Sequence, residues 1–400
     1  MTAANLDSFP LKIQPFIAKA GNEVVLPVDK ADPAKINLLD LDEKGLVAFF
    51  NDLGEKSFRA QQVIKWIHQR GIDDIDAMTD LNKALRLQLK ERCIIQAPKI
   101  VKEQSSEDGT HKWLLQLDSG NHIETVFIPE KTRGTLCISS QVGCALNCTF
   151  CSTATQGFNR NLTLSEIIGQ IWQASRRLRA LKGDNLTFKI TNVVMMGMGE
   201  PLLNYETVIK ALSIMRDDKA YALPRQRVTL STSGVVPYIE RLSVEADVSL
   251  AISLHEPNDE LRNRLVPLNK KYPISVLMAA CRRFIADKPT RHVVMEYVML
   301  KDVNDQKEHA KQLVQLLQGL ACKINLIPFN PYPGALYQRS TPETIKAFSA
   351  QLMRAGFITT VRKTRGDDID AACGQLVGKI IDRTKRNARF LKKRETHLSS

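Results

Sequence analysis

The sequence predicts an α/β protein built on a partial (β/α)6 barrel, with a small helical N-terminal domain and a basic C-terminal extension. Between Thr135 and Ala355, apolar strand-like stretches alternate with helical stretches six times. Repeated strand–helix units form a parallel sheet with helices outside it. Six units fall short of the eight strands that close a TIM barrel, so we expect a barrel that stays open on one side.

The 400 residues divide into five predicted segments. These are a flexible lead (1–36), a helical accessory domain (37–97), a β-hairpin linker that packs on the barrel (98–132), the barrel itself (133–361), and a reactive-cysteine loop with a basic C-terminal helix or tail (362–400). The lead mixes prolines with charges and shows no sustained period, apart from one short strand predicted at Glu23–Pro27.

Composition is that of an ordinary soluble protein, with 44% hydrophobic and 25% charged residues. No apolar run approaches the length needed to span a bilayer. The N-terminus lacks a basic start followed by an apolar core, so no secretory signal is evident. We therefore expect a cytoplasmic protein without a membrane partner, in a compartment where thiols stay reduced.

The chain carries an excess of positive charge. Lys and Arg number 56 against 43 Asp and Glu, which gives a net charge of +13. Such an excess favours a polyanionic partner through counterion release, and nucleic acid is the leading candidate. The alternative is that many soluble proteins are mildly basic without binding any polyanion.

The segment from Asn37 to Ala97 has a helical pattern. Ser57 is the predicted N-cap of a helix that covers Phe58–Arg70 and ends at Gly71. Its apolar residues, Ala60, Val63, Ile64 and Ile67, fall on one face. Basic side chains on the other faces fit an RNA-binding accessory domain and a small helical bundle with a solvated surface equally well.

From His111 the hydrophobic period becomes two. Lys112–Leu117 and His122–Pro129 are predicted strands around a turn at Asp118–Asn121. Glu124 lies inside the second strand. A strand glutamate usually faces solvent, so the pattern alone assigns it no role.

The barrel units follow. The six predicted strands are Thr135–Ser139, Val193–Met198, Arg227–Ser231, Val248–Ser253, His292–Leu300 and Lys323–Pro328. The predicted helices that follow them run over 163–181, with Thr163 and Glu166 as a capping box, and then over Tyr205–Met215, Pro237–Leu242, Ser275–Ala286, Gln306–Leu317 and Pro342–Ala355.

Polar or glycine-rich residues follow four of these strands, at Gly197–Pro201, Ser231–Gly234, Ser253–Glu256 and Pro328–Pro331. In barrels of this kind the active site lies at the C-terminal ends of the strands. We therefore expect these four stretches to meet at one site.

Three cysteines, Cys144, Cys148 and Cys151, stand within eight residues directly after the first barrel strand. A cubane iron–sulfur cluster usually has four thiolate ligands, so three leave one iron with an open position. A structural zinc site needs a fourth ligand, and the next cysteine is Cys281. A disulfide framework needs an oxidising compartment. A different metal, or thiols without any role, would also be compatible with this spacing.

The remaining cysteines differ in their surroundings. Cys93, Cys281 and Cys322 are interpreted as small core residues. Cys137 lies on an apolar strand, and its sequence environment alone would also make it a small core residue. Cys373 stands in a charged loop without hydrophobic periodicity, which favours a reactive thiol. The basic residues beyond it fit a solvated helix and a grip on the phosphate backbone about equally.

The cysteine loop, together with Gly199-Glu200-Pro201 after the second strand, resembles the radical S-adenosylmethionine (SAM) enzymes. Cys137 seven residues before the loop, the stretch Met196–Leu203, and Cys373 within Arg365-Gly-Asp-Asp-Ile-Asp-Ala-Ala-Cys-Gly-Gln make the chain similar to the RNA adenine-C2 methyltransferases of that superfamily. The resemblance extends from about Leu38 to about Lys393.

The resemblance implies a role for each matching residue. Cys144, Cys148 and Cys151 would bind one 4Fe–4S cluster. The residues implied to bind SAM are Gly199, Glu200, Ser231, Ser253, Leu254, His255 and Asn330. Cys373 would carry the methyl group, Cys137 would resolve the intermediate, and Glu124 would accept a proton.

The chemistry implied by the resemblance uses two SAM molecules per turnover. One methylates Cys373, and a second yields a 5′-deoxyadenosyl radical that removes hydrogen from the S-methyl group. The carbon then adds to C2 of adenine and links protein to RNA, because C2 has no lone pair with which to attack SAM. Loss of the C2 proton and attack of Cys137 on Cys373 would release the methylated base and leave a disulfide.

The resemblance also implies the partners. They are an adenine in the peptidyl-transferase loop of 23S rRNA, the adenine 3′ to the anticodon in some tRNAs, and an electron donor such as a flavodoxin system. A target base has to be unpaired or flipped to reach a barrel interior. We expect a monomer. Two competing interpretations are a related adenine-C8 methyltransferase and a non-catalytic, metal-containing RNA-binding protein.

Overall fold

A computed structural model describes residues 35–182, 189–286, 288 and 290–378. The strand predicted at Glu23–Pro27 and the basic tail predicted beyond Gly378 lie outside these residues. Within the described part of the chain, no helix is both long and apolar enough to cross a bilayer.

The N-terminal segment is helical, as predicted. It contains α1 (Glu43–Asp52), α2 (Phe58–Ile64), a π-helical turn (Lys65–Gln69) and α3 (Lys83–Arg92). The predicted apolar face of α2 and the turn after it is buried. The prediction that Ser57 caps this helix was wrong: Ser57 has helical backbone angles (φ −55°, ψ −27°), and its side chain makes no cap hydrogen bond. A cap residue needs an extended backbone to turn its side chain onto the first amides.

One ten-stranded sheet organises the rest of the described chain, in the order β14-β13-β12-β11-β10-β9-β6-β5-β4-β3. All neighbours from β6 to β14 pair in parallel. These strands are β6 (Gly134–Cys137), β9 (Asn192–Met195), β10 (Val228–Thr232), β11 (Ser249–Ser253), β12 (Val293–Met299), β13 (Cys322–Pro328) and β14 (Ile358–Val361).

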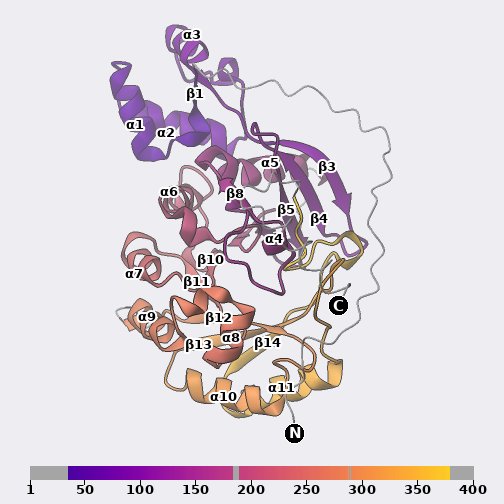
Figure 1. The fold of residues 1–400 in the computed structure, drawn as a ribbon. Coiled ribbons are helices and arrows are strands. Elements are labelled where there is room, and N and C mark those ends of the chain that lie inside the picture. Colours follow the sequence, from indigo (N-terminus) through magenta and orange to yellow (C-terminus); the bar gives the residue numbers. More distant parts are fainter. Residues whose placement is uncertain (1–34, 183–188, 287, 289, 379–400) are drawn as a thin grey trace. The chain divides into compact units, whose positions relative to one another are not determined.

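The six predicted strand–helix units are present, and a seventh parallel strand, β14, follows the last helix. Figure 1 shows the outer helices beside these strands. The helices are α5 (Leu164–Lys182), α6 (Tyr205–Arg216), α7 (Val236–Glu245), α8 (Asp259–Leu265), α9 (Ile274–Ala286), α10 (Lys307–Leu317) and α11 (Pro342–Arg354). The predicted capping box of α5 is confirmed: the Thr163 amide donates to Glu166 at 2.9 Å, and the Glu166 amide donates to Thr163 Oγ1 at 3.2 Å.

The predicted hairpin is present as β4 (His111–Gln116) and β5 (His122–Pro129). Its second strand pairs antiparallel with β6, so the hairpin extends the barrel sheet itself. A further strand, β3 (Lys99–Ser105), pairs with β4. The antiparallel strands β3–β5 thus lie at one side of the sheet, and β14 forms its opposite edge.

Candidate active site

The cysteine loop is held between two short strands and a short helix. Strand β7 (Gln141–Gly143) precedes it, β8 (Phe158–Asn161) pairs antiparallel with β7, and α4 (Ser152–Thr155) begins directly after Cys151. The Cys144 amide donates to Gly157 O at 2.8 Å, which closes the base of the loop. The loop is therefore a folded element, and its three thiols have defined positions.

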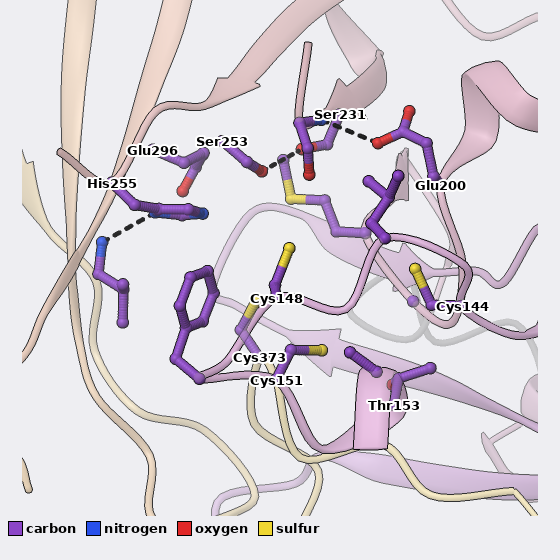
Figure 2. Close-up of a pocket in the computed structure, with 18 of the residues that line it drawn as sticks. Cys144, Cys148, Cys151, Thr153, Glu200, Ser231, Ser253, His255, Glu296 and Cys373 are labelled. Carbon is purple, nitrogen blue, oxygen red and sulfur yellow. Dashed lines mark hydrogen bonds between the residues drawn. The ribbon is translucent and has the colours of Figure 1, made fainter. Parts of the chain in front are cut away.

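The three thiols line a single cavity with about 1020 Å³ of empty space, including open solvent at its mouth. Figure 2 shows the sulfur atoms of these three cysteines around the same space as the side chains of Glu200, Ser231, Ser253 and His255. The polar lining residues include Glu200, Ser231, Ser253, His255, Asn330 and Cys373. The strand ends that were expected to meet do so here.

The donor set fits an iron–sulfur cluster. Burial raises the pKa of the Cys148 thiol well above its usual value, and the charges of Cys144 and Cys151 raise it further. Three neighbouring thiolates, one buried and two half-buried, need a cationic centre to offset their repulsion. Among the described residues, no three His, Cys, Asp or Glu side chains lie close enough to share one metal ion. In a cubane cluster each thiolate binds a different iron, so wider spacing is what the cluster requires.

Glu200 is presented to the cavity by a tight turn after β9. Gly199 has φ +100°, and a Cβ there would lie 2.5 Å from Gln141 Cβ, so the turn requires glycine. The Glu200 carboxylate accepts the Leu202 amide at 3.1 Å and the Ser233 amide at 2.8 Å. Burial nevertheless raises its pKa to about 7. A carboxylate fixed in this way suits an ammonium group.

Two serines and a histidine form the opposite wall. The hydroxyls of Ser231 and Ser253 lie 3.5 Å apart. His255 Nδ1 accepts the Val298 amide at 3.1 Å, so the ring proton resides on Nε2. Burial lowers the pKa of His255 to about 3, so the ring is neutral. Its edge contact with Phe150, with ring centroids 4.7 Å apart, fixes the ring plane.

Leu254, which was predicted to bind SAM, does not line the cavity. Its side chain is fully buried in the core, and its carbonyl accepts Arg262 Nε at 2.9 Å. Arg262, on α8, was not foreseen from the sequence. Its Nη2 also donates to Ser233 O at 2.9 Å and to Ser253 O at 3.2 Å, so one guanidinium ties two loops of the cavity together.

Replacing Arg262 with Met is expected to lower the free energy of unfolding by about 2–4 kcal/mol, because each buried carbonyl left unpaired costs about 1–3 kcal/mol. SAM affinity should fall with it, since the loops bearing Ser233 and Ser253 lose their common anchor. Urea unfolding and anaerobic SAM titration would measure both effects. Arg264→Met is the control, because Arg264 lies on the same helix but is exposed. Equal stability of the two variants would contradict the anchoring role.

Asn330 connects the cavity to the segment that carries Cys373. Its Nδ2 donates to Cys373 O at 3.3 Å, and its Oδ1 accepts Arg339 Nη2 at 2.9 Å and Thr364 Oγ1 at 3.2 Å. These two donors fix the orientation of the amide. Cys373 itself is exposed at the cavity lining.

Arg362 and Glu296 complete the charged part of the lining. Desolvation raises the pKa of the Cys373 thiol, while the charge and side-chain hydrogen bond of Arg362 act to lower it. Glu296 is buried on β12 and accepts two hydrogen bonds from Asn325 Nδ2, at 3.1 and 2.9 Å. A lone carboxylate inside an apolar strand was the signal that could have revealed Glu296. Arg362 follows β14, an unpredicted strand, and gave no such signal.

Cys137 and Glu124 lie outside the cavity lining but next to the Cys373 segment. Cys137 ends β6 as a free thiol, and burial raises its pKa to about 12, with the charge of Cys373 as the second cause. Glu124 is buried: its Oε1 pairs with Lys112 Nζ at 3.3 Å, and its Oε2 accepts the Val377 amide at 2.8 Å. The pattern of the strand suggested that Glu124 faces solvent, but the side chain is buried and forms an ion pair.

Comparison with known families divides the chain into two matched parts. The family described as the ribosomal RNA large subunit methyltransferase N-terminal domain matches residues 36–95. The radical SAM superfamily matches residues 138–314.

Individual relatives are similar over most of the chain. The dual-specificity RNA methyltransferase RlmN of Marinobacter nauticus is 58% identical over 358 residues, which cover 89% of this chain and 96% of the relative. The protein of the same name from Stenotrophomonas maltophilia is 57% identical, over 93% of this chain and 97% of its own. A solved radical SAM methyltransferase from Sphaerobacter thermophilus has a TM-score of 0.80 and 44% identity, covering 85% of this chain and 99% of that structure.

Proposed function

The chain belongs to the RlmN family of radical SAM RNA methyltransferases, which use a 4Fe–4S cluster and SAM, and we propose that it methylates C2 of adenine in RNA. The substrates proposed are an adenine in the peptidyl-transferase loop of 23S rRNA and the adenine 3′ to the anticodon of some tRNAs. The observation that carries this proposal is that Cys373 lines the same cavity as Cys144, Cys148 and Cys151.

The cluster would be held by these three cysteines. SAM would lie between the cysteine loop and the strand ends, with Glu200 at its amino group and Ser231, Ser253, His255 and Asn330 around the remainder. When bound, the cluster and SAM supply a methyl group and an organic radical that can remove hydrogen from an unactivated carbon. The lining is largely apolar apart from these side chains, and its walls would shield such reactive species on all sides but the mouth.

Cys373 is proposed to accept the methyl group and to carry the carbon to adenine. Its attack on a methyl group requires the thiolate, and the Arg362 guanidinium lowers the cost of that charge. Adenine C2 offers no lone pair, so the carbon has to arrive already bound to the protein. The covalent link that follows is a thioether in which one CH2 group joins Cys373 Sγ to C2.

Glu124 and Cys137 are proposed to complete the turnover. Glu124 would take the proton that leaves C2; burial raises the pKa of its carboxyl and makes it a better base than an exposed glutamate. The adduct would also lose one electron to a one-electron acceptor, for which the cluster is the candidate. Cys137 would then attack the sulfur of Cys373, so that a disulfide forms, the bond between sulfur and the bridging carbon breaks, and that carbon takes up a proton to become the methyl group of the base. The charge of Cys373 helps to raise the pKa of Cys137, and this proximity supports the pairing.

The remaining partners are also proposals. We assign the helical segment 37–97 to RNA contact, which its match to an rRNA methyltransferase N-terminal domain supports. We infer a cytoplasmic monomer reduced by a flavodoxin-type donor. The chief competing product is C8-methyladenine.

Anaerobic reconstitution, followed by incubation with protein-free rRNA and labelled SAM, tests the proposal directly. Digestion of the RNA to nucleosides and mass spectrometry should locate the label on C2 of adenine. Label on C8 would overturn the proposed position, and label-free RNA with intact SAM would overturn the enzymatic role.

SAM affinity is expected to increase as the pH rises through about 7. The Glu200 pKa is raised to about 7 by burial, and only the carboxylate can pair with the SAM amino group. From about pH 6 to about pH 8 the ionised fraction grows from about a tenth to about nine tenths, so the dissociation constant should fall roughly tenfold. Anaerobic calorimetry measures it. Glu200→Gln should remove this slope, and a wild-type affinity that does not change with pH would contradict the assignment.

A further inference from the structure

Helix α4, which begins directly after the last cysteine of the loop, makes three hydrogen bonds to one remote segment. The Ser152 amide donates to Gly374 O at 2.8 Å, and Thr153 Oγ1 donates to Leu376 O at 2.8 Å. Gln156, at the C-terminal end of the helix, donates from Nε2 to Gly378 O at 2.7 Å. More than 200 residues separate the two partners in each case, so nothing local produces these contacts.

The same segment, residues 373–378, also makes hydrogen bonds to parts of the chain outside α4. Asn330 donates to Cys373 O, the Val377 amide donates to Glu124, and Gln375 Nε2 donates to Pro331 O at 2.8 Å. The segment belongs to no helix or strand. Its backbone polar groups are satisfied by other parts of the chain, so its shape depends on those donors and acceptors.

Thr153 is suited to hold this segment rigidly. Its side chain is 3% exposed, and its hydroxyl donates to Leu376 O at 2.8 Å. The neighbouring Thr155 differs: its hydroxyl donates to Ser152 O within the helix, at 2.7 Å. Two threonines on one short helix thus provide one long-range and one purely local hydrogen bond.

We propose that helix α4 couples the cysteine loop to the Cys373 segment, with Thr153 and Gln156 as positioning residues for the methyl carrier. When the loop is ordered by its cluster, α4 presents its donors and the Cys373 thiol is held at the cavity. When the loop loses order, the segment loses three of its anchors together. The inference rests on the proposed role of Cys373, but the coupling itself is a property of the fold.

Backbone hydrogen exchange of the full-length, anaerobically reconstituted protein tests this coupling without using activity. In Thr153→Val the hydroxyl is replaced at nearly constant volume, and exchange in a peptide covering 373–378 should be roughly 5- to 150-fold faster, the effect of one lost buried hydrogen bond. Iron and sulfide content should match the wild type. Thr155→Val should exchange like the wild type, and Thr153→Ser should restore protection.

Removal of the cluster should speed exchange in the same peptide of the wild-type protein. Unchanged protection in an iron-replete Thr153→Val variant, or equal protection with and without the cluster, overturns the proposal. Faster exchange at 373–378 in Thr155→Val would also overturn the proposal, because the general packing of α4 would then hold the segment.

If Thr153→Val fails to retain iron, Gln156→Met decides the question, because Thr153 lines the cavity of the three cysteines and Gln156 does not. Faster exchange at 373–378 with full iron content supports the coupling, and wild-type exchange overturns it. Methyl transfer by a Cys373→Ala variant would overturn the carrier role instead and would leave the exchange result intact, so the two failures can be told apart.

Discussion

Replacing Cys373 with Ala is expected to abolish RNA methylation, by roughly 10³-fold or more, while iron content and SAM binding stay at wild-type levels. Removal of the nucleophile from a covalent mechanism has effects of this scale. Cys373 lines the cavity but is not one of the three loop cysteines, so the cluster should assemble without it. Transfer of labelled methyl from SAM to rRNA is the measurement, with iron analysis on the same sample.

The matched control for this substitution is Cys322→Ala. Cys322 is also a free thiol, at the start of β13, and lies outside the cavity lining. The Cys322→Ala variant should therefore methylate RNA at the wild-type rate. Normal methylation by Cys373→Ala would contradict the carrier role. A joint loss of iron and activity would indicate that the substitution disturbs the structure of the cysteine loop.

Replacing Cys137 with Ala is expected to trap the protein on its RNA. Without the second thiol nothing breaks the link between Cys373 and the base, so a covalent adduct should accumulate to about one per enzyme. A denaturing gel should show a shifted band that disappears on RNase treatment. The substitution removes a half-buried thiol, and Cys137→Ser nearly keeps its volume as a check on folding.

The double variant Cys137→Ala/Cys373→Ala provides the control for adduct formation. It should give no shifted band, because the carrier sulfur is missing. Full turnover by the single Cys137 variant would remove this residue from the mechanism. A shifted band that persists in the double variant would place the cross-link on another residue.

Hydrophobic periodicity was enough to predict the six strand–helix units, because each has an apolar face that burial requires. The two strands of the ten-stranded sheet that escaped prediction, β3 and β14, lie at its two edges. In β14 all four side chains remain exposed or half-exposed, and two of them are threonines. In β3 most side chains are also partly exposed, so neither strand shows the alternation that marks a half-buried strand.

The candidate site divides in the same way. The cysteine loop was predicted because its three cysteines stand within eight residues of sequence. Cys373 was predicted because it stands in a charged loop without hydrophobic periodicity. The supporting groups could not be predicted. Arg262 stands in the polar stretch Asp259–Leu265 and looks like a surface residue until tertiary packing buries it. Likewise, Thr153 and Leu376 meet only because the chain folds back across the barrel.

The two thiols proposed to handle carbon lie at opposite ends of the barrel sequence. Cys137 is in the first parallel strand, and Cys373 follows the seventh. Because a chain is synthesised from its N-terminus, the cysteine loop and every strand of the sheet leave the ribosome before Cys373 does. A nascent chain can therefore receive its iron while the cavity still lacks the segment that packs on α4. That segment then adds Cys373, Gly374 and Leu376 to the lining, so the proposed acceptor thiol is among the last parts of the site to be synthesised.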